Sequence, residues 1–158
     1  MKAWRFKPFE ELGIEIPRGS RREALEAAAE YIRTAMLDYI GSGTSPVSGF
    51  GKFPGYTKTY KDFKKGESSA STVNLELSGE MLDALDARVS GSTINVNVYG
   101  DSDLEGKAEG NNLGTYGKAN PIPGKARRFI PVGNERLKKD ILQGVKDILK
   151  EYESDGES

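Results

Sequence analysis

Apolar residues recur at helical spacing in two separate parts of the chain. They fall three or four positions apart over residues 20–40 and again over residues 134–152, which is the period of an amphipathic helix. Ser20 opens a capping box for the first helix, Gly41 supplies a left-handed residue that ends it, and Asn134 can cap the second helix. The two stripes predict two long amphipathic helices. Their apolar members are Leu25, Ala28, Ala29, Ile32, Met36 and Tyr39 in the first helix, and Leu137, Ile141, Val145, Ile148 and Tyr152 in the second.

A second pattern, alternation of apolar and polar residues, occurs between these helices. The alternation covers residues 94–99, the second half of a predicted hairpin over residues 87–99. Gly91-Ser92 within that stretch is typical of a two-residue hairpin turn. A short helix is expected from Ser78, and a short, weak one over residues 102–113, where two glycines interrupt it. Together these elements predict an α+β fold, in which a small antiparallel β-sheet is packed by two long amphipathic helices, with long extended loops.

The two ends of the chain are expected to differ from this body. Residues 1–19 are predicted to form an extended N-terminal arm, because Pro8 and Pro17 oppose a regular helix there. The aromatic residues of the arm pack either on the arm's own domain or on a neighbouring subunit. Residues 20–152 are assigned to a single domain, and residues 153–158 are expected to form a disordered acidic tail.

Two long loops, residues 41–72 and 114–132, are rich in glycine, proline and basic residues. The first loop also contains aromatic residues, which argue against simple disorder because disordered tracts are poor in them. Alternating lysine and aromatic residues are found in proteins that bind single-stranded nucleic acid, although lysine in a loop is usually just solvated. The cations that we expect to face nucleic acid or a partner protein are Lys52, Lys58, Lys61, Lys64, Lys65, Lys118, Lys125 and Arg127.

Composition narrows the chemistry that the chain can perform. The 158 residues contain no histidine and no cysteine, so the commonest general base, thiolate nucleophiles and cysteine metal ligands are missing. Acid pairs such as Asp101 and Asp103 lack the spacing of a calcium loop, and the glycine-rich loops lack the context of a phosphate-binding motif. No apolar run approaches the roughly 20 residues that a membrane helix requires. We therefore expect no enzymatic activity, no cofactor, no metal and no membrane contact.

Three segments, taken in order, carry a family pattern. The first, residues 45–65, contains S-P-V-S-G, then F-P-G-Y-T-K-T-Y and a pair of lysines. The second, residues 73–82, is V-N-L-E-L-S-G-E-M-L, and the third, residues 108–130, contains L-G-T, then I-P and R-R-F-I. In this order and spacing the segments resemble the phage virion-morphogenesis, tail-completion or head–tail-joining (neck) proteins. Residues 20–152 would then be a single α+β domain of the tail-completion kind.

The resemblance implies a non-enzymatic ring subunit in the neck of the virion. Its partners would be further copies in a homo-oligomeric ring, commonly a hexamer, a portal, adaptor or stopper protein on the head side, and a tail tube or terminator protein on the tail side. Packaged DNA passes through such rings, so the basic loops could face the lumen. Aromatic rings and a methionine would anchor subunit contacts, glycine and proline would set loop geometry, and Arg128 would pair with a carboxylate; packing within the domain is the alternative for each. The residues expected at the subunit interface are Phe53, Tyr56, Tyr60, Met81, Gly114, Pro123, Arg128 and Phe129.

The chain departs from the family pattern in two places. The acid or histidine that the family usually has before Gly-Thr is absent, and Asn111, Asn112 and Leu113 occupy that stretch. Two arginines, Arg127 and Arg128, compete for the place of one family arginine.

Two functions of other classes stay open. The chain could be a small nucleic-acid-binding protein that uses its basic loops, residues 52–65 and 118–128, and would then bind free DNA in a salt-sensitive manner. A carboxylate-dependent hydrolase is the other alternative, and it would bind a divalent metal.

Overall fold

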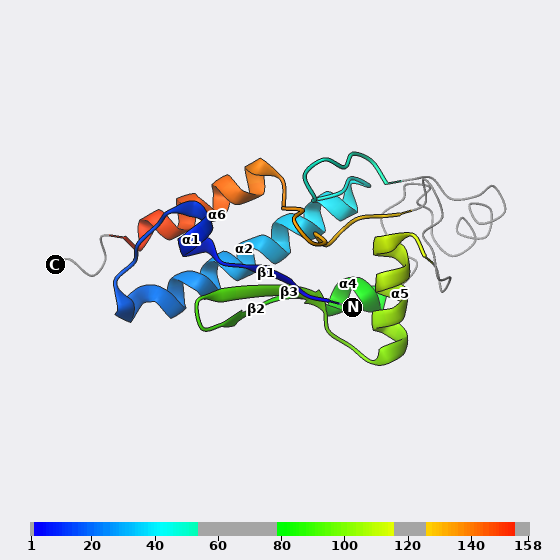
Figure 1. Cartoon of the computed structure of the whole chain (residues 1–158), viewed down its shortest axis with the longest axis horizontal. Coiled ribbons are helices and arrows are strands. Elements are labelled where there is room, and N and C mark those ends of the chain that lie inside the picture. The colour runs from blue at the N-terminus through cyan, green and yellow to red at the C-terminus, as the bar shows by residue number, and fades with distance from the viewer. Residues whose placement is uncertain (1, 54–78, 116–125, 154–158) are drawn as a thin grey trace.

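The computed structural model describes residues 2–53, 79–115 and 126–153 (Figure 1). The described part has an α+β architecture in which a three-stranded antiparallel sheet is covered on one face by helix α2, and helix α6 packs on α2 (Figure 1). The elements are β1 (Trp4–Phe6), α1 (Pro8–Leu12), a 3-10 turn η1 (Arg18–Ser20), α2 (Arg21–Gly41), α4 (Gly79–Ala84), β2 (Leu85–Ser90), β3 (Thr93–Val98), α5 (Ser102–Leu113) and α6 (Lys139–Glu151).

The sheet is built from a hairpin and the N-terminal strand. Strands β2 and β3 pair along their whole lengths on either side of the turn, where Gly91 has a φ of 60°. This confirms the hairpin predicted for residues 87–99. Strand β1 pairs antiparallel with the other edge of β3, with Trp4 opposite Val96, so the strand order is β1-β3-β2.

Only one of the two helices expected to be long has that length. Helix α2 has 21 residues and follows η1 directly, whereas α6 has 13 residues and begins at Lys139. The expectation that Asn134 caps the second helix is therefore wrong, and Lys138 occupies the N-cap without a side-chain hydrogen bond. Residues 132–135 form a turn closed by the hydrogen bond from Glu135 N–H to Val132 O at 3.1 Å. Between this turn and Lys139, Leu137 forms an isolated β-bridge with Val47. This pairing keeps Leu137 out of the helix, although Leu137 lies at helical spacing from the apolar residues of α6.

The ends of α2 also differ from the predicted caps. Ser20 belongs to the preceding turn, with φ −103° and ψ −6°, and its side chain makes no capping hydrogen bond. Gly41 lies inside the helix, and the left-handed residue is Gly43, with a φ of 80°. The carbonyl of Gly43 accepts the N–H of Phe53 at 2.9 Å. The turn after α2 is therefore held in part by a hydrogen bond to Phe53 in the loop that follows. The pattern of apolar residues within the helix gives no sign of this contact.

The N-terminal segment, expected to be an extended arm, packs on its own domain, which is one of the two alternatives given for its aromatic residues. Trp4 and Phe6 are buried on β1, and their rings stack with centroids 5.2 Å apart. Residues after this strand form helix α1 rather than extended chain. Pro8 stands at its first position, where the missing N–H costs no hydrogen bond, so the proline starts the helix instead of preventing it.

Helix α5 is regular where glycines were expected to interrupt it. The carboxylate of Asp101 caps the helix by accepting the N–H of Leu104 at 2.8 Å. The helix runs through Gly106 to Leu113, and Gly114 ends it with a φ of 77°.

The apolar core lies between the sheet and the two helices α2 and α6. Each layer contributes fully buried side chains, so the described segments share one core. Among residues 2–53, 79–115 and 126–153, no helix is long and apolar enough to cross a membrane. The largest fully buried side chains are those of Phe6, Phe129, Leu25, Ile32, Met36, Ile40, Leu85, Ile94, Ile130, Leu137 and Ile141.

Candidate functional site

The described parts of the first and third resemblance segments meet where residues 126–138 contact the end of α5 on one side and residues 44–53 on the other. We call residues 44–53, 111–114 and 126–138 the Asn112 junction, after the buried side chain that links two of them. These segments lie together near the C-terminal end of α2 (Figure 1). The backbone hydrogen bonds that join them are Arg127 N–H to Asn111 O at 2.7 Å, Lys138 N–H to Pro46 O at 2.9 Å and Ser48 N–H to Arg136 O at 2.8 Å.

Asn112 lies in the last turn of α5 and is only 1% exposed. Its Oδ1 accepts the N–H groups of Phe129, at 2.8 Å, and Ile130, at 3.1 Å. Its Nδ2 donates to the carbonyl of Ile130 at 3.0 Å. Buried backbone groups left unpaired cost roughly 1–3 kcal/mol each. The side-chain amide of Asn112 pairs these groups of Phe129 and Ile130, as the backbone of a neighbouring strand would.

Arg128 connects the two sides of the junction. One of its Nη atoms donates to the carbonyl of Asn112, its Nε lies 2.9 Å from Oε1 of Glu135, and its guanidinium lies 5.2 Å from the ring centroid of Phe50. The two side chains of the ion pair are 15% and 27% exposed, so solvent screens this pair less than an ordinary surface pair. The carboxylate that was expected to pair with Arg128 is thus found in the same chain.

Gly114 has a local role that the structure explains. Its φ of 77° lies in the left-handed region, which favours glycine. A Cβ atom at this position would lie 2.8 Å from the backbone nitrogen of Ala126. Glycine therefore allows α5 to end and the returning chain to pass directly against it.

Three predicted interface residues lie in the core of their own chain. Phe53, Met81 and Phe129 are 7%, 3% and 0% exposed, and so have almost no surface left for a neighbouring subunit. The structure thus supports the alternative for them, packing within the domain. Core and interface aromatic residues look alike in sequence, because both are large and apolar.

Two of the cations expected to face a partner or DNA lie in the described residues, and they differ in exposure. Lys52 is exposed, and its backbone forms an isolated bridge with Thr44. Arg127 is only 5% exposed, so its side chain is turned into the protein and does not present its charge to a partner or to DNA. The remaining predicted residues lie outside the described ranges: Tyr56, Lys58, Tyr60, Lys61, Lys64, Lys65, Lys118, Pro123 and Lys125.

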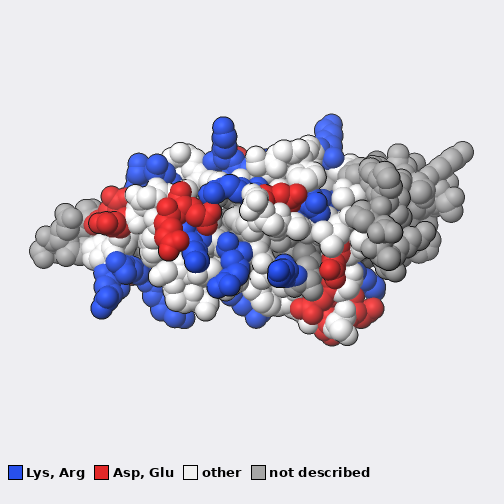
Figure 2. Space-filling view, viewed as in Figure 1, with Lys and Arg blue, Asp and Glu red and all other residues white. Residues whose placement is uncertain are grey.

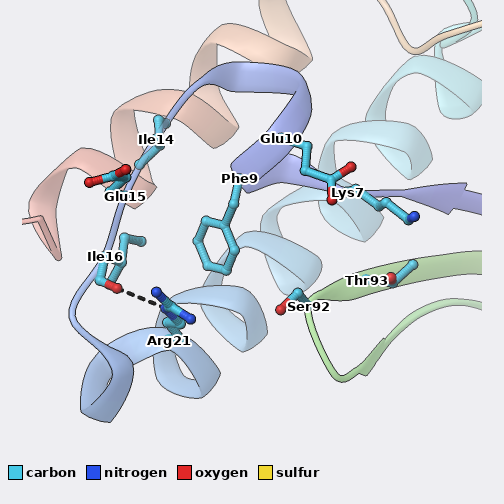
Figure 3. A pocket seen from close by; sticks show the side chains of 9 residues that line it. All are labelled: Lys7, Phe9, Glu10, Ile14, Glu15, Ile16, Arg21, Ser92 and Thr93. Atoms are coloured by element: carbon cyan, nitrogen blue, oxygen red, sulfur yellow. Dashed lines mark hydrogen bonds between the residues drawn. The ribbon is translucent and has the colours of Figure 1, made fainter.

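Two grooves flank strand β1, and sequence reasoning missed both. The β1–α5 groove, with a volume of about 640 Å³, lies between residues 2–5, the end of α5 and residues 131–133. The α1 groove, of about 460 Å³, lies between α1, the chain that follows it and the β2–β3 turn (Figure 3). In the α1 groove Arg21 donates to the carbonyl of Ile16 at 2.8 Å and lies 5.8 Å from the ring of Phe9 (Figure 3).

Basic side chains run along β1 between these grooves. Lys2, Arg5 and Lys7 are all exposed, and Figure 2 shows a row of blue side chains where Figure 1 places β1. Acidic residues are present too, since Glu109 lines the β1–α5 groove and Glu10 lines the α1 groove. In the sequence, these basic side chains are indicated only by the charged residues that surround Trp4, Phe6 and Phe9 in the N-terminal segment.

Two tyrosines have raised pKa values. The hydrogen bond from the Tyr39 hydroxyl to Asp140, at 2.6 Å, together with partial burial, raises the pKa of Tyr39 to about 12. Burial raises the pKa of Tyr99, and Arg88, whose guanidinium lies 3.8 Å from that ring, partly opposes the shift. Both shifts favour the protonated, neutral hydroxyl.

The fold and these sites define the chain as a small α+β domain whose candidate binding surfaces are extended segments and an open strand edge. Within the described ranges, no group of three or more acidic side chains is arranged to hold a metal ion. Comparisons with protein-family models, with curated proteins and with solved structures found no match.

Proposed function

We propose that the chain is a structural virion protein of a tailed phage, without enzymatic activity, which forms a ring at the head–tail interface as a tail-completion or head–tail-joining protein. The observation that supports this proposal is the Asn112 junction. A pattern spread over residues 45–130 is expected to come together in space if it maintains one common structure, and the described parts of its first and third segments meet there. The shielded ion pair with Glu135 favours Arg128 over Arg127 as the counterpart of the family arginine.

The architecture is compatible with the work of a ring subunit. Such a subunit needs a rigid core that holds its contact segments in fixed positions, and α2 with the sheet supplies that core. Its partners would be further copies of the chain, commonly six, a portal, adaptor or stopper protein toward the head, and a tail tube or terminator protein toward the tail. Packaged DNA would cross the lumen, and the protein would be located in the virion neck.

Electron microscopy of phage particles made without this protein tests the proposal. We expect filled heads and finished tails that are separate from each other, and we expect a wild-type copy supplied in trans to restore complete virions. Complete, infectious particles in the absence of the protein would overturn the proposal.

The alternative, a nucleic-acid-binding protein, is tested on the purified chain. It requires tight binding of free DNA that weakens steeply as salt is added, because each neutralised phosphate releases counterions. Of the cations assigned to this role, the described ones give mixed support, since Lys52 is exposed and Arg127 is buried.

A further inference from the structure

Strand β1 has an open edge. In a two-residue hairpin the residues that flank the turn, here Ser90 and Thr93, exchange both of their backbone hydrogen bonds. Alternation along β3 then directs the backbone groups of Ile94 and Val96 toward β1, where they meet Phe6 and Trp4. The N–H and C=O of the residue between these two, Arg5, therefore point away from the sheet. No strand in the described part of the chain pairs with this edge.

The open edge is bordered by basic side chains and has space beside it. Arg5 and Lys7 are two positions apart, so in extended chain they project from the same face. The β1–α5 groove opens beside Lys2 and Arg5, and the α1 groove opens beside Lys7. Val132, in the wall of the β1–α5 groove, is 40% exposed, a large value for an apolar residue. Both backbone groups of Lys7 already bond Glu11, so Arg5 offers the outward backbone groups. These groups, the cations and the apolar wall together suit an extended acidic peptide.

The chain itself contains a segment with these properties. Residues 153–158 read Glu-Ser-Asp-Gly-Glu-Ser, so an acid occupies every second position and small residues lie between. A period of two is the period of a strand, which would place Glu153, Asp155 and Glu157 on one face. The small residues on the opposite face would allow close approach to the groove wall.

The position of α6 separates a chain's own acidic segment from its β1–α5 groove, which favours a second copy as the source of the segment. Helix α6 begins just after the residues that wall the β1–α5 groove and runs away from them (Figure 1). Its 13 residues place Glu153 about 20 Å farther away. Five further residues span at most about 17 Å when extended, so a chain's own acidic segment falls short of its β1–α5 groove.

We propose that the acidic segment of one copy, residues 153–158, adds as a strand to the open edge of β1 in the next copy, with its carboxylates facing Arg5 and Lys7. Such a contact joins two different surfaces of the same molecule, and repetition of it generates a ring if the rotation closes. The inference deepens the proposed function, on which it rests for the ring, by naming the contact between neighbouring subunits.

The test is the association state of the purified full chain, measured by sedimentation at increasing concentration. We expect concentration-dependent association that weakens about tenfold or more when the three acids are neutralised (Glu153→Gln, Asp155→Asn, Glu157→Gln), and similarly for Arg5→Glu with Lys7→Glu. The matched control neutralises three exposed acids of α2 (Glu23→Gln, Glu26→Gln, Glu30→Gln) and should leave association unchanged. Thermal unfolding of every variant verifies that it is folded.

Two further measurements address the geometry. Chains with Arg5→Glu and Lys7→Glu, mixed with chains in which the three acids are changed to lysine, should associate with each other through the reversed charges. Hydrogen exchange should show the Arg5 amide unprotected in the monomer and protected in the assembly, because an added strand would pair with it.

A chain that stays monomeric, association that both variants leave intact, or association without protection of the Arg5 amide would each overturn the contact. These outcomes are distinct from failure of the proposed function. If the purified chain is monomeric but particles made without it still have separate heads and tails, only this contact is overturned. If virions made without the protein are normal, the proposed function is overturned, and the contact is then decided by the sedimentation and hydrogen-exchange results alone.

Discussion

Asn112 and Ile130 are joined by a two-way pair of hydrogen bonds. The side-chain Oδ1 of Asn112 accepts the N–H of Ile130 at 3.1 Å, while its Nδ2 donates to the carbonyl of the same residue at 3.0 Å. A neighbouring strand would satisfy both backbone groups of one residue in the same way. An ionised carboxylate at this position could not donate the second bond.

Replacing Asn112 by alanine should therefore destabilise the protein by about 2–4 kcal/mol, because it leaves buried backbone groups at Phe129 and Ile130 unpaired. Urea denaturation measures the loss. Asn111→Ala is the matched control, since that side chain is only part-buried and bonds within its own helix to Lys107 O at 3.0 Å. Similar losses for the two variants would contradict the role given to Asn112.

Gly114→Ala should cost about 2–5 kcal/mol, because it adds a left-handed alanine and also a Cβ that lies 2.8 Å from Ala126 N. Gly133→Ala separates the two effects. Gly133 has a φ of 62°, but a Cβ there meets nothing within 4 Å, so only the backbone strain of about 1–2 kcal/mol applies. Equal losses in chemical denaturation would show that the approach of Ala126 is not tight.

Gly144→Ala tests the packing of α6 on α2. Alanine normally stabilises a helix interior relative to glycine, but a Cβ at this position would overlap the ring of Tyr31, whose Cε1 would be 2.6 Å away. We expect a net loss of about 1–3 kcal/mol, since the ring must leave its site. Gly106→Ala in α5, where a Cβ meets nothing within 4 Å, should instead stabilise by up to about 1 kcal/mol. Thermal unfolding should show shifts of opposite sign.

The hydrogen bond between Tyr39 and Asp140 predicts a pH dependence at the alkaline end. The folded state raises the pKa of Tyr39 from its ordinary value near 10 to about 12, so the folded protein holds the phenolic proton more tightly than the unfolded chain does. The stabilisation is fully present below the ordinary tyrosine pKa, about 10, and is lost as the pH rises toward 12.

Tyr39→Phe and Asp140→Asn both remove this linkage. The difference in unfolding free energy between the wild type and Tyr39→Phe should therefore shrink between pH 10 and pH 12, as measured by urea denaturation. A difference that stays constant over this range would show that the bond to Asp140 does not control the titration of Tyr39.

Sequence reasoning predicted the elements whose signals are local. The hairpin around Gly91 was confirmed because turn chemistry and alternation act within a few residues. Helix α2 and the α+β class were confirmed because a long apolar stripe must be buried against another element. The absence of histidine and cysteine from the whole chain, and the spacing of acids in residues 153–158, are likewise properties of the sequence alone.

The tertiary structure decided everything that depends on a distant partner. Leu137 continues the apolar stripe of α6, yet its bridge to Val47 holds it in extended chain. Trp4 and Phe6 lie in a supposed arm, yet β3 supplies an edge that makes them a core strand. Local propensities differ by only about 1 kcal/mol per residue, whereas burying one large apolar side chain contributes about 1.5–3 kcal/mol, so contacts between remote segments outweigh local preference wherever the two conflict.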